Sequence, residues 1–388
     1  MSVALLAGPI ANKPLNGGEA WVRLNWLLGL QRLGFDVCFV ERLTAAASVD
    51  DAGAPCAPAD SVNRRHLEAA MEEHGLGGRW ALLGEDGESL AGLGTAEVES
   101  LAGEAELLFN HSGHLEGPLG VAPRRRVYVD LDPAFTQTWS ADPALAFSVA
   151  GHDHHVSVGL NVGRPDCPLP TGGLDWIPTL PPVALDQWPV AAAPDAGLSR
   201  FTTVASWRSP SGQIAVAGHP AGGKHHEFRR LLELPGRVGG ARFELALDIH
   251  PADAADREAL LGAGWELVPP DRVAATPDAF ADYVRGSAAE LSAAQGAYVA
   301  SRCGWFSDRT AAYLASGRPA LVQDTGVGDA LPVGTGLLTF SDLAGAEEGA
   351  RRILAEPEGH AAAARQLACD HLDSDLVLGR LLERIGVV

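Results

Sequence analysis

The segment between residues 304 and 326 holds side chains that are suited to bind an anion. Ser307, Asp308 and Arg309 begin a stretch with apolar residues at helical spacing, which predicts a helix that ends at Gly317. Unpaired N–H groups at a helix start attract anions, whereas a cation there is unfavourable unless an anion lies beside it. The pattern therefore favours a phosphate site. In the alternative interpretation, Ser307 or Asp308 only caps the helix and Arg309 pairs with Asp308.

A second cation stands in a similar setting near the middle of the chain. Lys224 ends a glycine-rich loop that follows an expected strand at 213–217 and precedes a helix, so its ammonium group could contact a phosphate. The loop is not a P-loop, because His225 stands where Ser or Thr is required. In the first half of the chain, Gly17 and Gly18 could let the backbone approach a ligand or could simply relax a turn.

Candidates for proton transfer follow expected strands of the first half. Asp130 and Asp132 lie two positions apart in extended chain, so both point to the same side. His111 and His154 lie after the expected strands 107–109 and 147–149, in two short loops that hold five of the thirteen histidines. Imidazole titrates near neutral pH, so one of them could be catalytic, although structural and solvated histidines are more common. No spacing typical of metal ligands is present, and we expect no metal site.

Composition and charge exclude several classes of protein. The chain has 388 residues, 46% hydrophobic content and 20% charged content, typical of a globular protein. Its net charge of −20 argues against binding to a nucleic-acid polymer or to an anionic membrane surface. The five cysteines lack C-x-x-C spacing, the N-terminus has no charged leader, and no apolar run approaches the roughly 18 residues of a membrane span. We therefore expect a cytoplasmic protein with reduced cysteines.

Strand and helix patterns alternate along both halves, which predicts an α/β protein with parallel sheets covered by helices. At this length two domains are expected. The proline-rich stretch 165–189 reads as a stiff connection, so we place the boundary near it and expect a ligand cleft between the domains. Around the phosphate helix the expected order is a strand at 297–300, a loop at Gly304, the helix, and a strand at 320–323.

These features resemble the GT-B class of nucleotide-sugar-dependent glycosyltransferases over nearly the whole chain. The stretch 304–326, GWFSDRTAAYLASGRPALVQDTG, with LPVGTGLL at 331–338, is similar to the donor-binding segment of that class. The resemblance implies two Rossmann-like domains, an acceptor-side one at 1–185 and a donor-binding one at 186–370, with a C-terminal helix at 371–388 that could pack back on the first.

The resemblance also implies roles for individual residues. Lys224 would contact the donor diphosphate, the Gly17-Gly18 loop would face the donor, and the phosphate helix would begin at Ser307, Asp308 and Arg309. Many retaining members carry two glutamates where this chain has Gly304 and Ala312. The sugar contacts could instead be made by Asp324, Thr325 and Gly326.

The expected function is transfer of a sugar from a nucleoside-diphosphate sugar to a small-molecule acceptor, such as a natural product, without a metal or other cofactor. A base on the opposite wall of the cleft would be required if the reaction inverts configuration, and Asp132, Asp130, His111 and His154 are the candidates. Two alternatives stay open: a sugar-nucleotide epimerase of the same class, and a two-domain binding protein without catalysis.

Overall fold

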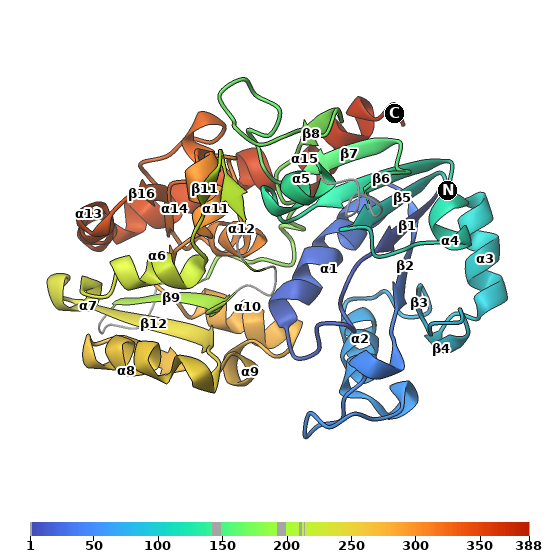
Figure 1. Ribbon diagram of the computed structural model, residues 1–388, viewed down its shortest axis with the longest axis horizontal. Coiled ribbons are helices and arrows are strands. Elements are labelled where there is room, and N and C mark those ends of the chain that lie inside the picture. Colours follow the sequence, from blue (N-terminus) through green and yellow to red (C-terminus); the bar gives the residue numbers. More distant parts are fainter. Residues whose placement is uncertain (1, 142–148, 192–198, 209–211, 213, 388) are drawn as a thin grey trace.

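The computed structural model describes residues 2–141, 149–191, 199–208, 212 and 214–387. Two α/β lobes lie side by side in Figure 1, and each is built around its own parallel sheet. We call the lobe with strands β1 to β8 the first lobe and the lobe with strands β9 to β16 the second lobe. Among the described residues, none of the helices is long and apolar enough to cross a membrane.

The first-lobe sheet has the order β4-β3-β2-β1-β5-β6-β7-β8. Its strands are β1 (Val3–Ala7), β2 (Asp36–Arg42), β3 (Trp80–Leu83), β4 (Ser89–Gly92), β5 (Leu107–His111), β6 (Arg125–Asp130), β7 (His154–Ser157) and β8 (Trp176–Pro178). Its helices are α1 (Gly17–Arg32), α2 (Val62–Glu73), α3 (Thr95–Glu104), α4 (Pro118–Val121) and α5 (Phe135–Ser140). The expected strand at 147–149 falls mostly outside the described residues.

The second-lobe sheet has the order β13-β12-β9-β14-β15-β16. Its strands are β9 (Ser199–Ser206), β12 (Ala241–Asp248), β13 (Glu266–Val268), β14 (Ala289–Ser292), β15 (Ala320–Gln323) and β16 (Leu337–Phe340), and β10 (Ala215–Val216) with β11 (His219–Pro220) forms a separate hairpin. The helices that follow are α6 (Lys224–Arg230), α7 (Leu234–Arg237), α8 (Ala254–Gly262), α9 (Pro270–Val273), α10 (Pro277–Arg285), α11 (Gly296–Ser301), α12 (Asp308–Ala315), α13 (Leu343–Ala355), α14 (Pro357–Leu367) and α15 (Ser374–Arg384).

The central strands are apolar because they are covered on both faces. Every residue of β1 is buried, and Ala4 lies opposite Val37 of β2 and Leu107 of β5 in parallel register. Strand β4 is an exception to the expected parallel order, since it runs antiparallel to β3. Only residues 84–88 connect these two strands, and a parallel connection needs a crossover of about a dozen residues or more.

The expected strand at 297–300 is wrong, because these residues lie in helix α11. The sheet strand is β14, where the fully buried Glu290 interrupts an otherwise apolar pattern. The helix expected to follow is confirmed as α12, and it ends where Gly317 adopts a positive φ of 69°. The strand expected at 213–217 is shorter than predicted and forms the β10–β11 hairpin, with residue 213 outside the described part.

Helix α15 comes after the second lobe in the chain but packs on the first, and Figure 1 shows it on the side of the N-terminus. A Cβ built on Gly29 of α1 would lie 2.7 Å from Leu378 of α15, so the missing side chain permits close packing. Arg32 of α1 donates a hydrogen bond of 3.0 Å to Asp375. One continuous apolar core joins first-lobe residues such as Leu27 to second-lobe residues such as Phe280.

Candidate active site

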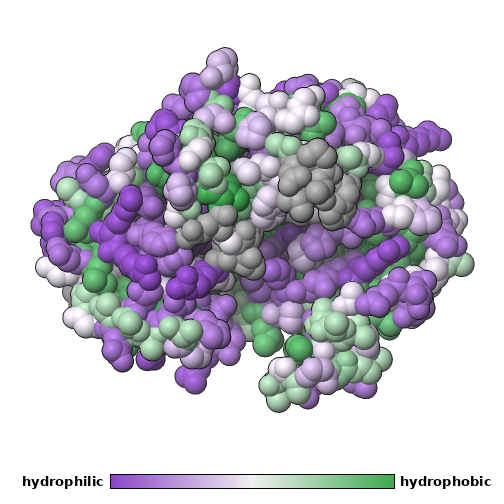
Figure 2. Space-filling view, in the orientation of Figure 1, coloured by the Kyte–Doolittle hydropathy of each residue, from purple (hydrophilic) through white to green (hydrophobic). Residues whose placement is uncertain are grey.

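A cavity of about 810 Å³ opens between the two lobes. That volume falls in the range of roughly 300–1,000 Å³ that ligand sites occupy. The first lobe contributes the loop before α1 and the first turns of α1; the second contributes the ends of β9, β12 and β13 and the starts of α6, α9 and α12. Figure 2 shows mostly hydrophilic surface on both sides of the hollow between the lobes. The cavity lies at the carboxyl ends of parallel strands, where open α/β sheets bind ligands.

Lys224 is the first residue of α6 and lines the cavity. Its backbone N–H donates a hydrogen bond of 2.9 Å to the side chain of Gln295, which fixes the start of the helix. Burial, and next the charge of Arg309, lower the pKa of Lys224 to about 8, while Asp132 and Glu290 act in the opposite direction. Among the described residues Lys224 takes part in no salt bridge, so its charge is available to a ligand.

Arg309 lines the same cavity, but its guanidinium group is already held by the second lobe. Its Nε donates to the carboxylate of Glu290 at 2.7 Å, and one terminal nitrogen donates to the carbonyl of Val204 at 2.9 Å. The other terminal nitrogen bonds to the hydroxyl of Ser292. The anion that balances this cation at the helix start is therefore the buried Glu290. Within the described residues Arg309 forms its salt bridge with Glu290 and not with Asp308.

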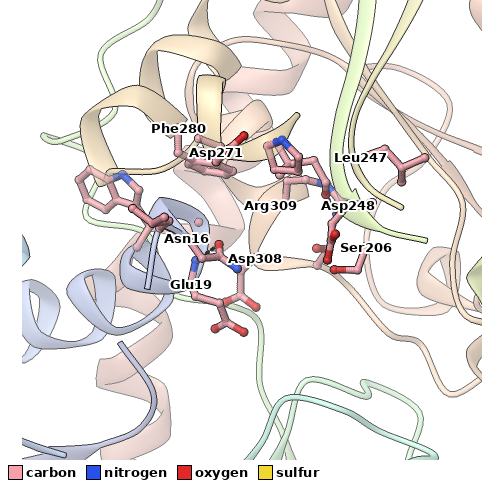
Figure 3. Close-up of a pocket in the computed structure, with 18 of the residues that line it drawn as sticks. Asn16, Glu19, Ser206, Leu247, Asp248, Asp271, Phe280, Asp308 and Arg309 are labelled. Carbon is pink, nitrogen blue, oxygen red and sulfur yellow. Dashed lines mark hydrogen bonds between the residues drawn. The ribbon is translucent and has the colours of Figure 1, made fainter. Parts of the chain in front are cut away.

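Asp308 lines the cavity from the first turn of α12, with its carboxylate toward the first lobe. Figure 3 shows it next to Glu19, while Arg309 extends toward Asp248 and Ser206. Burial raises the pKa of Asp308 to about 6; Arg23 opposes the shift and Glu19 adds to it. Ser307 occupies the N-cap position, but its side chain makes no capping hydrogen bond. The N–H groups of this helix start are therefore not used by a Ser307 cap.

Glu19, on the first turn of α1, lines the opposite wall of this part of the cavity, and Arg23 lies buried behind it. The side chain of Asn16 caps the helix by accepting a hydrogen bond of 3.1 Å from the Glu19 backbone. Arg23 is only 2% exposed and forms a salt bridge with the Glu19 carboxylate. Within the described residues, its buried Nε has no hydrogen-bond partner. Sequence reasoning missed both residues, since they lie in a mostly buried helix whose pattern marks neither side chain as functional.

The four catalytic candidates are not among the described residues that line the cavity. Asp130 is fully buried and accepts hydrogen bonds from Thr136, Gln137 and Ser157, so it holds the turn after β6. Asp132 accepts a hydrogen bond from Tyr298 of the second lobe, and its charge raises the pKa of Lys224.

The two candidate histidines belong to strands β5 and β7 and do not line the cavity. His111 ends β5 and is completely buried, with its ring 5.0 Å from that of Trp26 and with no hydrogen-bond partner among the described residues. Burial lowers the pKa of His111 well below its usual value. His154 begins β7, opposite Val127 of β6.

Five of the nine donor-site candidates line the cavity: Gly18, Lys224, Ser307, Asp308 and Arg309. Gly17 instead touches the other lobe. Its N–H donates to the carbonyl of Ala274 at 2.8 Å, and a Cβ built on it would lie 1.9 Å from the Thr276 oxygen. The glycine is thus explained by contact between lobes.

The segment of Asp324, Thr325 and Gly326 is also placed at a lobe contact rather than at the cavity. Asp324 pairs with Arg302 at 3.1 Å. Gly326 accepts a hydrogen bond of 3.0 Å from the side chain of Asn161 in the first lobe. Thr325 donates to the carbonyl of Trp305 at 2.7 Å. None of the three lines the cavity, and the sugar contacts expected of them stay a prediction.

Sequence reasoning missed the remaining wall of the cavity, which lies at the ends of β9, β12 and β13. Ser206 and Asp248 end their strands, and Asp271 follows a Pro-Pro pair at the start of α9. Polar residues directly after apolar strands were the available signal. No group of three or more His, Cys, Asp or Glu side chains in the described part of the chain is arranged to hold a metal ion.

No family model matches the sequence. The search of curated proteins likewise gives no match. Solved structures do match. The structure of Alr3699/HepE from Anabaena in complex with UDP-glucose has a TM-score of 0.60 at 10% identity, over 100% of both chains.

Two further structures show the same likeness. An α-glucosyltransferase in complex with UDP and a 13-mer DNA has a TM-score of 0.60 at 10% identity, over 100% of this chain and 99% of that one. AviGT4, a glycosyltransferase involved in avilamycin A biosynthesis, has a TM-score of 0.51 at 17% identity, over 99% and 96% of the two chains. At such identities the likeness shows the fold alone.

Proposed function

We propose that this chain, which has the GT-B fold of two Rossmann-like domains, is a glycosyltransferase that moves a sugar from a nucleoside-diphosphate sugar to a small-molecule acceptor. One observation carries the proposal: Lys224 and Arg309, from different helix starts of the second lobe, meet at one cavity between the lobes. The same fold holds UDP-glucose in the Anabaena structure, which supports a uridine or similar donor here.

The chemistry requires a stabilised diphosphate leaving group. Lys224 supplies a positive charge that no described carboxylate pairs with, and the positive end of the α12 dipole faces the same cavity. Arg309 adds a fixed positive group, weakened by its pairing with Glu290. In this proposal no metal ion is needed at the diphosphate, because these groups together neutralise the charge that develops on it.

Calorimetric titration with UDP and UDP-glucose tests the proposal. We expect the unaltered protein to bind both, and Lys224→Ala to weaken binding at least about tenfold, a loss of about 1.4 kcal/mol. Arg272→Ala is the matched control, since it removes an exposed cation of α9 that does not line the cavity. Equal affinities of Lys224→Ala and the unaltered protein would contradict the proposed site.

Arg309→Ala alone is a poor test, because it leaves the carboxylate of Glu290 buried without a partner. The double variant Arg309→Met with Glu290→Gln removes both charges and keeps the volumes similar. This double variant should fold, and it should bind UDP more tightly than Lys224→Ala does.

An epimerase would instead isomerise the sugar of UDP-glucose without any acceptor, which NMR of the recovered nucleotide sugar would reveal.

A further inference from the structure

Successive residues of α12 direct opposite charges to opposite sides of the cavity. The guanidinium of Arg309 turns into the second lobe, where Glu290 and Ser292 hold it. The carboxylate of Asp308 turns toward the first lobe and approaches Glu19 of α1 (Figure 3). A ligand whose phosphates lie at Lys224 and Arg309 and which extends toward the first lobe would therefore meet the Asp308 carboxylate.

Glu19 is held in place by the buried guanidinium group of Arg23. Arg23 lies one helical turn after Glu19 and donates to both its carboxylate and its backbone carbonyl, the latter at 3.2 Å. Because the buried guanidinium of Arg23 makes both of these hydrogen bonds, it fixes the position of Glu19. Glu19 thus presents a second carboxylate to Asp308 from the other lobe, and both side chains line the cavity.

A purely structural role does not explain Asp308. A carboxylate that caps a helix or neutralises a cation is normally stabilised in its ionised form. Here the N-cap position belongs to Ser307, and Arg309 pairs with Glu290 instead. The charged groups that face Asp308 are Glu19 and Arg23 on α1 and Arg309 on its own helix. Its carboxylate also accepts a hydrogen bond from its own backbone N–H, and burial outweighs these effects on its pKa. With a pKa of about 6, the Asp308 carboxylate can take up a proton near neutral pH.

We propose that Asp308 is the general base that accepts the proton of the acceptor hydroxyl, that Glu19 positions it and tunes it across the cleft, and that transfer inverts the configuration of the sugar. This inference rests on the proposed function, since it assigns a role within the same reaction.

The step balances as follows. The acceptor oxygen gives its proton to Asp308 and forms a bond to the anomeric carbon, while the bond from that carbon to the diphosphate oxygen breaks. The electron pair leaves with the diphosphate, whose added charge Lys224 and Arg309 stabilise. Asp308 later returns the proton to solvent. In this assignment Asp308 takes the proton on the side of the first lobe and the diphosphate leaves toward Lys224 and Arg309 of the second lobe, and displacement from opposite sides of the carbon inverts the configuration.

Hydrolysis of UDP-glucose, with water as the acceptor, tests the role of Asp308. We expect Asp308→Asn to lower the rate of glucose release at least about 100-fold, in the range typical of a general base, while calorimetric affinity for UDP-glucose stays within about threefold. Asp278→Asn is the matched control, because this exposed aspartate also lies in the first turn of a helix, α10, but does not line the cavity. Its rate should be unchanged.

Two further readouts separate this role from a structural one. NMR of the α-linked donor during hydrolysis should show β-glucose as the first product. Glu19→Gln should shift the acid limb of the pH–rate profile to lower pH, because loss of the neighbouring negative charge makes Asp308 easier to ionise. A merely structural Glu19 would change the rate without moving that limb.

The outcomes distinguish this inference from the proposed function. If UDP-glucose does not bind to the unaltered protein, both are overturned. If UDP-glucose binds, four results would overturn only the role of Asp308. Asp308→Asn could release glucose at the normal rate, or its rate and affinity could fall in parallel. The first product could be α-glucose, or the unaltered protein could release no glucose at all. A melting temperature of Asp308→Asn close to that of the unaltered protein shows that the variant is folded.

Discussion

Lys224 and Arg309 are both cations at helix starts, yet they are held in different ways. The guanidinium of Arg309 is tied to Glu290 inside the second lobe, whereas the ammonium group of Lys224 has no salt bridge within the described residues. A molecule with a net charge of −20 thus keeps at the cavity a lysine that no carboxylate of the described residues pairs with. This difference makes Lys224 the residue whose protonation should govern binding of an anion.

Affinity for UDP should depend on pH through Lys224. Its pKa of about 8 in the free protein means that it is charged below this value and neutral above it. A bound diphosphate favours the charged form, so we expect affinity to be constant at lower pH and to fall by up to about tenfold per unit as pH rises through about 8. Calorimetric titrations across this range measure the effect.

Lys224→Ala serves as the control for this titration. Its weaker affinity should be nearly independent of pH across the same range, since UDP itself has lost its last phosphate proton at lower pH. A decline of equal steepness in the variant would assign the titration to another group of the cavity.

The sequence allowed some of the individual residues of the candidate site to be predicted, but not their partners. The helical pattern and the glycine loop selected Arg309 and Lys224, which both line the cavity, since helix starts and loops are local features. The argument that Arg309 needs an anion was sound, but that anion is Glu290, which belongs to a strand that the pattern did not reveal. The contact between Asp308 and Glu19 is long-range, and no local pattern reports it.

Helix α1 is the element that joins the lobes around the cavity. Its first residue, Gly17, donates to the carbonyl of Ala274, and the indole of Trp21 donates to the carbonyl of Pro277 at 2.8 Å. The ring of Trp21 also lies 4.7 Å from that of Trp188, which lines the same cavity. The start of α1 therefore touches the second lobe and shapes the cavity at once.

Gly17→Ala should weaken this junction. A Cβ would lie 1.9 Å from the Thr276 oxygen, and the backbone of one lobe would have to move away. We expect a loss of about 1–3 kcal/mol in the free energy of unfolding, as for other overpacked sites, and a weaker affinity for UDP. Urea denaturation and calorimetry measure the two effects.

Gly379→Ala is the matched control in helix α15, because a Cβ at that position meets no atom within 4 Å. It should stabilise the protein by up to about 1 kcal/mol through helix propensity alone. If Gly17→Ala were equally harmless, the contact between α1 and residue Thr276 would not form in solution.

Strands and helices were predicted correctly where the apolar residues of the sequence are the ones that are buried in the structure. Strands β5 and β15 contain buried apolar runs, and the strands expected at 107–109 and 320–323 were confirmed there. The pattern failed at 297–300, where an apolar run belongs to α11, and at β14, where a charged residue is buried. Short apolar runs do not distinguish helix from strand, and a buried ion pair hides a strand from a hydropathy pattern.

The whole molecule is held together by chain segments that cross between the lobes. Asn161 of the first lobe donates to the carbonyls of Arg302 and Gly326, each at 3.0 Å, and Tyr298 of the second lobe donates to Asp132. The alternation of strands and helices predicted two α/β domains and the GT-B resemblance predicted their arrangement across a cleft. Which residues join them depends on contacts between distant segments, which the sequence alone does not show.

Helix α15 should stabilise both lobes, because it ends the chain yet packs against α1 in the core that runs through the molecule. Leu378→Ala removes a completely buried side chain, so we expect a loss of about 2–5 kcal/mol in the free energy of unfolding. Leu376→Ala, the same change at a position of the same helix that is 40% exposed, should cost less than about 0.5 kcal/mol. Calorimetry should show one transition in both variants, shifted to lower temperature in Leu378→Ala. Two separate transitions, with only one displaced, would show that α15 supports a single lobe and that the shared core does not couple them.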